Sequence, residues 1–115
     1  MPTHHSIDYI EFAVLDLPES RRFYSEAFGW GFTEYGPDYV GITIDDREVG
    51  GMHPSEEIAQ GGPLVILYSD NLEDSLAAVV AAGGEVVVQP FDFPGGRRFH
   101  FEDPSGNELA VWSKA

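Results

Sequence analysis

Cysteine is absent from this sequence of 115 residues, and basic residues are few. Without cysteine the chain can form no disulfide framework, zinc–thiolate cluster or thiolate nucleophile. Six Lys and Arg residues stand against twenty Asp and Glu residues, which gives a formal net charge of −14. Such a chain repels the phosphates of nucleic acids and the surfaces of anionic membranes. We therefore expect neither nucleic acid nor a membrane as a partner.

Long apolar runs are also lacking. No stretch approaches the roughly 18 consecutive apolar residues that a membrane-spanning helix requires, and the N-terminus shows no basic patch followed by an apolar run. A cytoplasmic location is therefore expected. The length and the hydrophobic content of 43% predict one domain over residues 1–115, with a single compact core.

The first half of the chain shows a strand followed by a helix. Side chains alternate in character over residues 9–14, which predicts a strand with one buried face. Asp16 is placed as an N-cap, apolar residues then recur at helical spacing over 17–28, and Gly29 marks the helix end. Three short β-like runs separated by turn residues follow, at Gly31–Tyr35, Tyr39–Ile44 and Glu48–Met52.

The second half repeats this order. A strand-like run, Leu64–Tyr68, precedes a second capped helix that ends near Gly83 and Gly84, and the matching positions differ by 55 residues (71 − 16 and 84 − 29). The matches place Asn71 on Asp16, Leu72 on Leu17, Ser75 on Ser20 and Gly84 on Gly29. Three more β-like runs follow, at Glu85–Gln89, Arg98–Phe101 and Glu108–Trp112. A repeat of cap, helix and stop together indicates an internal duplication.

The predicted fold is therefore α+β, built from two βαβββ modules. Module one covers about residues 7–54, and module two covers about residues 63–113. One such half cannot cover both faces of its own sheet. The two sheets should close on one another, either within the chain or across a dimer.

Two motifs resemble the vicinal oxygen chelate superfamily, which includes glyoxalase I, extradiol dioxygenases and bleomycin-resistance proteins. The module-one motif is Asp16-Leu17, Phe23-Tyr24 and Phe28-Gly29-Trp30, and the module-two motif is Asp103-Pro104-Ser105-Gly106-Asn107. The resemblance extends over nearly the whole chain. It implies a cup-shaped half-barrel and a homodimer, in which we expect a partner to bury Phe28, Trp30 and Trp112.

The resemblance also implies four metal-binding positions, one on the first and one on the last strand of each module. Here they are occupied by Tyr9, Gly51, Leu64 and Ala110. None supplies the imidazole or carboxylate that divalent transition ions prefer, so we expect no metal cofactor. The alternative is a displaced divalent-metal site built from Glu11, Glu108 and His100, as in a lyase, isomerase or dioxygenase relative.

Strand alternation predicts which side chains line the cavity of the cup. The predicted set is Tyr9, Glu11, Arg98, His100, Glu108 and Trp112. His100 or Glu11 would act as a general base, and Arg98, next to Arg97, would hold an anionic group. Tyr9 and Trp112 would be stacking walls.

Plainer interpretations of these residues remain open. Glu11 or Glu108 could pair with Arg98, and His100 could be a strand residue hydrogen-bonded to a neighbour. A domain whose sheets serve only for assembly is a third possibility. The prediction is a metal-free protein that binds a small organic molecule, preferably a compact aromatic or carbonyl compound with at most one negative charge.

Overall fold

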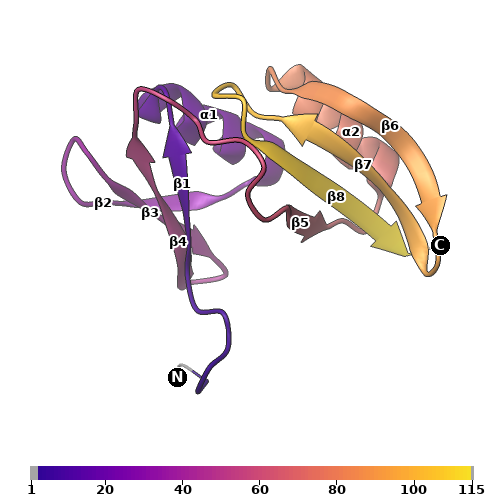
Figure 1. The fold of residues 1–115 in the computed structure, drawn as a ribbon, viewed down its shortest axis with the longest axis horizontal. Helices are drawn as coiled ribbons and strands as arrows, with labels where there is room; N and C mark the ends of the chain where they lie inside the picture. Colours follow the sequence, from indigo (N-terminus) through magenta and orange to yellow (C-terminus); the bar gives the residue numbers. More distant parts are fainter. Residues whose placement is uncertain (1–2, 115) are drawn as a thin grey trace.

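The computed structural model describes residues 3–114, which form two four-stranded sheets and two helices (Figure 1). The first module comprises β1 (Ile10–Val14), α1 (Leu17–Phe28), β2 (Gly31–Glu34), β3 (Val40–Ile44) and β4 (Arg47–Pro54). The second comprises β5 (Val65–Tyr68), α2 (Leu72–Ala81), β6 (Glu85–Phe93), β7 (Gly96–Glu102) and β8 (Glu108–Lys114). The predicted order, βαβββ twice, is confirmed.

The two sheets share one topology. The strand order is β1-β4-β3-β2 in the first sheet and β5-β8-β7-β6 in the second. Strand β1 runs parallel to β4, and β5 runs parallel to β8. All other neighbouring strands are antiparallel. The sheets lie side by side without forming a closed barrel (Figure 1).

The caps of both helices form as the sequence predicts. The Asp16 carboxylate accepts a hydrogen bond from the Glu19 backbone at 2.9 Å, and the Asn71 side chain accepts one from Asp74 at 3.0 Å. Gly29 ends α1 with a φ of 74°, in the left-handed region that favours glycine.

The end of α2 differs from the prediction by one residue. Gly83, with a φ of 102°, takes the left-handed conformation that the repeat assigned to Gly84. Gly84 serves close packing, since a Cβ there would lie 2.7 Å from Val79 and 2.9 Å from Phe23. The second helix is two residues shorter than the first, because α1 has 12 residues and α2 has 10.

The end of β6 also differs from the prediction, whereas the turn between β3 and β4 lies where the sequence predicts it. Strand β6 continues past Pro90 to Phe93, because register shifts along its pairing with β7 accommodate the proline. Asp45 and Asp46 connect β3 to β4 with φ values of 50° and 62°, as in a hairpin turn of type I′.

Both modules contribute to one hydrophobic core. Phe23 and Phe28 of α1 pack on Phe101 of β7, with ring centroids 6.0 and 5.7 Å apart. Tyr24 stacks on Trp30 at 4.5 Å. Phe28 and Trp30 thus pack against the core and remain partly exposed, and their burial by a partner stays a prediction.

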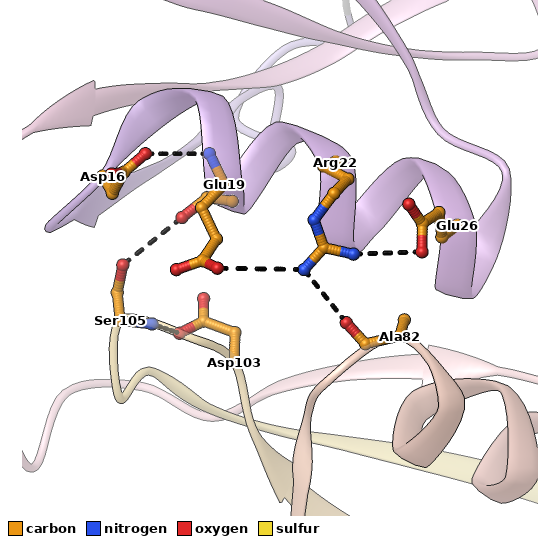
Figure 2. A network of polar contacts seen from close by, with 8 residues as sticks. Asp16, Glu19, Arg22, Glu26, Ala82, Asp103 and Ser105 are labelled. Atoms are coloured by element: carbon orange, nitrogen blue, oxygen red, sulfur yellow. Dashed lines mark hydrogen bonds and ion pairs between the residues drawn. The ribbon is translucent and has the colours of Figure 1, made fainter.

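Polar contacts also connect helix α1 to module two (Figure 2). Arg22 donates to the Ala82 carbonyl at 3.2 Å, and Ser20 contacts Ser105 at 3.3 Å. Within residues 3–114 no helix has the length and apolar character needed to cross a membrane.

Candidate functional site

Each sheet has one face towards the helices and one concave face away from them. Phe12 and Val14 of β1 are buried in the core, as are Phe99 and Phe101 of β7. Residues between them point the opposite way, because side chains alternate along a strand. The predicted assignment of Glu11, Arg98 and His100 to the concave faces follows from this alternation.

Two glycines create a trough on the concave face of the first sheet. Gly51 pairs with Glu11 on one side and with Gly41 on the other, so the three residues form one row across β1, β4 and β3. A Cβ at Gly51 would lie 2.0 Å from the Tyr39 hydroxyl, and one at Gly41 would lie 2.6 Å from the Glu48 carboxylate. The missing side chains therefore leave the space that Tyr39 and Glu48 occupy.

Three phenols and two carboxylates meet over this trough, and we call them the phenol–carboxylate cluster. Tyr39 donates to Glu11 at 2.8 Å, and Tyr9 donates to Glu48 at 2.9 Å. The Tyr9 and Tyr39 hydroxyls are 2.9 Å apart, and Tyr35 donates to the second oxygen of Glu48 at 2.7 Å. The cluster thus consists of Tyr9, Glu11, Tyr35, Tyr39 and Glu48.

The phenols of this cluster are held in their neutral form. Partial burial, followed by hydrogen bonds with Tyr9 and Glu11, raises the pKa of Tyr39 well above its ordinary value. Partial burial likewise raises the pKa of Tyr9. The hydrogen bond to Glu48 raises the pKa of Tyr35. At neutral pH the three hydroxyls therefore act as hydrogen-bond donors.

The residues at the four family metal positions do not fit a divalent transition ion. Gly51 has no side chain and is covered by the Tyr39 hydroxyl, and the Tyr9 hydroxyl is engaged with Tyr39 and Glu48. Leu64 and Ala110 are apolar. Within residues 3–114 no three His, Asp or Glu side chains converge as a set of metal ligands.

On the concave face of the second sheet, an imidazole pairs with a carboxylate. His100 Nδ1 lies 2.8 Å from Glu108 Oε2, and the His100 side chain is only 12% exposed. Its Nε2 atom is buried and has no hydrogen-bond partner within the described chain. When Nδ1–H of the neutral ring donates to Glu108, Nε2 is left as an acceptor.

Arg98 lies on the same face, next to aromatic rings. Its guanidinium carbon is 5.3 Å from the centroid of the Phe91 ring and 5.8 Å from that of Phe93. Its Nε atom is buried without a partner, and no carboxylate within residues 3–114 forms an ion pair with it. The alternative in which Glu11 or Glu108 pairs with Arg98 is therefore wrong, since Glu11 bonds to Tyr39 and Glu108 to His100.

Arg97 does not share the role of Arg98. It pairs with Glu73 of α2 at 2.6 Å and with Asp92 of β6 at 3.5 Å, on the helix side of the sheet. The hydrogen bond to Glu73 raises the pKa of Arg97 and lowers that of Glu73. The charge of Arg97 is therefore compensated by carboxylates of the same chain.

Two hollows adjoin the predicted site residues. One, of about 240 Å³, is lined by Ile66, Phe93, Arg98 and Trp112, and we call it the Arg98 cavity. The other, of about 600 Å³, lies between the modules and is lined by β1, residues 58–65 and the start of β8, including Glu11 and Glu108. A groove of about 680 Å³ beside α1 and β2 is larger but contains no predicted site residue.

The six predicted site residues thus fall into two groups, one on each sheet. Tyr9 and Glu11 belong to the first sheet, and the other four belong to the second, where His100 pairs with Glu108 and Arg98 lies opposite Trp112 in the strand register. Sequence reasoning missed the following contributors: Tyr35, Tyr39, Glu48, Phe91, Phe93 and Ile66. Two signals for finding them were available in the sequence. One was the alternation of side chains along β5, and the other was the pair of glycines on β3 and β4, Gly41 and Gly51.

Comparison with known proteins agrees with the resemblance that the sequence motifs indicate. The sequence model of the Glyoxalase/Bleomycin resistance protein/Dioxygenase superfamily matches residues 6–111. The chain is 26% identical to CFP32 of Mycobacterium bovis, over 91% of this chain and 44% of that protein. It is 31% identical to the anthracycline biosynthesis protein DauV of Streptomyces sp., over 86% of this chain and 43% of that protein. This chain therefore spans less than half the length of these two relatives.

The solved structures show the same architecture. A crystal structure of a glyoxalase-related enzyme from Fulvimarina pelagi aligns with a TM-score of 0.80, at 22% sequence identity. The alignment covers 96% of this chain and 88% of that one. At this identity the similarity establishes the fold, with its two mixed sheets, and leaves function to be argued from the site.

Proposed function

Because this chain belongs to the Glyoxalase/Bleomycin resistance protein/Dioxygenase superfamily, we propose that it binds a small organic molecule on its concave faces without a metal cofactor. The observation that carries the proposal is the pair of unsatisfied polar atoms, Arg98 Nε and His100 Nε2, on the concave face of the second sheet. Buried polar atoms are normally hydrogen-bonded, so two on one face point to a missing partner. A ligand is such a partner.

The proposed roles follow the two groups of site residues. In the second sheet Arg98 holds a polar group of the ligand, Trp112 provides an aromatic wall, and Glu108 orients His100. In the first sheet Tyr9 and Glu11 offer polar contacts to the part of the ligand that lies towards the other module. Hollows lined by aromatic and apolar residues with a few placed polar groups are typical of small-molecule sites.

A specific observation also favours a catalytic role for His100. Glu108 fixes one ring nitrogen, so the other is oriented as a base, as in carboxylate–imidazole pairs of enzymes. With an enolisable carbonyl substrate, Nε2 would take the proton next to the carbonyl, and the electron pair would move to the carbonyl oxygen. Return of the proton to the carbonyl oxygen would give the enol, and its return to the opposite face of the same carbon would give the epimer, so that either step completes an isomerisation. Glu11 is the second candidate base, held by Tyr39.

The displaced metal site is the competing explanation. It would require Glu108 and His100 to exchange their mutual contact for bonds to an ion, with Glu11 leaving Tyr39. Each of these changes breaks a hydrogen bond that the protein already makes. The metal-free proposal requires none of them.

Removal of metal is therefore expected to leave ligand binding unchanged. Protein purified without an affinity tag or chelator would be assayed for metal, then divided into a chelator-treated portion and one supplied with divalent zinc, manganese, iron or nickel. A thermal-shift screen of small organic compounds should find the same binders in both portions. Binding only in the metal-loaded portion, abolished by Glu108→Gln, would establish the displaced site instead, and a screen without any binder would overturn the proposed function.

We also propose that the protein is a homodimer. Ile66, Tyr68 and Phe91 leave 43%, 50% and 37% of their surface exposed, all on the second sheet, and these residues add apolar surface for a partner to that of Phe28, Trp30 and Trp112. Sedimentation should show a dimer at tens of micromolar protein, and a monomer at that concentration would contradict the proposal.

The proposed setting is the cytoplasm, with no nucleic-acid or membrane partner. The formal charge of −14 supports this, because nucleic acids and anionic lipids carry the same sign.

A further inference from the structure

We propose that the Arg98 cavity is selective for a compact planar monoanion, such as an aromatic or conjugated carboxylate. This inference rests on the proposed function, since it names the class of ligand for that same site. Arg98 carries the argument. It is the half-buried cation on the concave face of the second sheet, and the described chain supplies no counter-ion for it.

Among the five arginines, Arg98 and Arg47 lack a counter-ion within residues 3–114, and Arg47 is exposed to solvent whereas Arg98 is not. With twenty acidic residues available, Arg21, Arg22 and Arg97 each pair with at least one carboxylate. Arg98 is half-buried, and Glu108 on the same face is engaged by His100. A half-buried cation without an anion is costly, and an anionic ligand would remove that cost.

The rings around Arg98 prepare it for a planar group. Phe91 and Phe93 both lie within about 6 Å of the guanidinium carbon, close enough for cation–π attraction. Ring contacts use the face of the guanidinium and leave its N–H donors available for a carboxylate, which matches their fork geometry. The aromatic rings thus hold the cation without competing for its hydrogen bonds.

The remaining walls of the cavity set the size and shape of the ligand. Ile66 and Trp112 line it together with Phe93, so the surface around the cation is apolar and aromatic. The volume of about 240 Å³ is below the usual range for drug-sized ligands. A single ring with one carboxylate fits both constraints.

The long-range field of the protein limits the charge of the ligand. A formal charge of −14 repels anions, but salt screens this repulsion beyond about 8–10 Å. A guanidinium–carboxylate contact acts at hydrogen-bond distance and prevails inside the cavity. A second negative charge on the ligand would meet the repulsion, because the other cation of this face, Lys114, lies at the exposed end of β8 and does not line the cavity.

Three single-ring probes of similar size and different charge test the proposal: benzoate, benzamide and benzylamine. Binding would be measured by calorimetry on the parent protein and on Arg98→Gln, with Arg47→Ala as a matched control. Arg47 is an exposed arginine at the start of β4 and lines neither the Arg98 cavity nor the groove between the modules. The three proteins would first be compared by circular dichroism and thermal unfolding to establish that they fold alike.

Benzoate should bind at least about tenfold more tightly than benzamide, and benzylamine should bind least. Arg98→Gln should weaken benzoate about tenfold or more, with little change for benzamide, whereas Arg47→Ala should change benzoate affinity less than about twofold. If benzamide or benzylamine binds as well as benzoate, or if Arg98→Gln leaves benzoate affinity unchanged, the ligand class is wrong. The proposed function would then still stand on any binders from the metal-independent screen, so the two failures are distinguishable.

Discussion

Gly50→Ala is expected to destabilise the protein by about 3 kcal/mol or more, a loss of roughly 12 °C or more in Tm. A Cβ at this position would lie 2.2 Å from the carbonyl oxygen of Ile10, which is its register partner on β1. Both groups belong to the backbone of neighbouring strands, so neither can rotate away. The substitution therefore forces β1 and β4 apart, and β1 carries Glu11 and core residue Phe12.

Two other glycines provide controls for the same change. A Cβ at Gly62 meets nothing within 4 Å and its φ is not positive, so Gly62→Ala should stay within about 0.5 kcal/mol of the parent. Gly51→Ala is intermediate, because the atom in its way is the hydroxyl of the Tyr39 side chain. Urea unfolding followed by circular dichroism measures all three, and equal midpoints for Gly50→Ala and Gly62→Ala would refute the close approach of β1 and β4.

Gly51→Ala also probes the phenol–carboxylate cluster. Displacing Tyr39 should break its contacts with Glu11 and Tyr9, and Tyr39→Ala in the same chain should relieve the clash. The effects of the two substitutions would then fail to add, as expected for residues in contact.

The helices were predictable because their signals are local. An N-cap acts three residues along the chain and a C-terminal glycine acts within one turn, so Asp16, Asn71 and Gly29 fix helix ends without reference to the rest of the fold. Strand alternation is local too, and it placed Arg98 and His100 on one face. The one-residue error at Gly83 arose from assuming that the repeat preserves helix length.

The composition of the site was harder to predict because it depends on strand register. Tyr39 and Glu48 meet Tyr9 and Glu11 only because β3, β4 and β1 align two glycines in one row. A register is set by the whole sheet, and a shift by one residue would move these side chains to the other face. The unpaired state of Arg98 likewise depends on Glu108 selecting His100, a choice that neither residue reveals in the sequence.

Asp103→Ala is expected to cost about 4 kcal/mol of stability, or roughly 15 °C in Tm. The Asp103 carboxylate is buried and accepts hydrogen bonds from the Tyr24 hydroxyl at 2.8 Å and from the Ser105 and Asn107 backbone N–H groups at 2.9 Å each. Alanine would leave these donors unsatisfied, at about 1–3 kcal/mol for each buried one. It would also remove the Tyr24–Asp103 hydrogen bond between helix α1 and the loop of module two, a loop that Figure 2 shows in contact with α1 through Ser105 as well.

Tyr24→Phe tests the contact between the modules separately from the hydrogen bonds within the loop. It removes one hydrogen bond and leaves the backbone donors satisfied, so its cost should be about 1–2 kcal/mol, clearly below that of Asp103→Ala. Burial, reinforced by Asp103, raises the pKa of Tyr24 well above its ordinary value of 10.0. Because the folded pKa is the higher one, Tyr24 contributes full stability below about pH 10 and progressively less above it, by up to about 1.4 kcal/mol per pH unit. Chemical denaturation at rising alkaline pH should show a smaller loss in Tyr24→Phe than in the parent, and parallel curves, or equal costs for the two substitutions, would show that Asp103 does not join the modules through Tyr24.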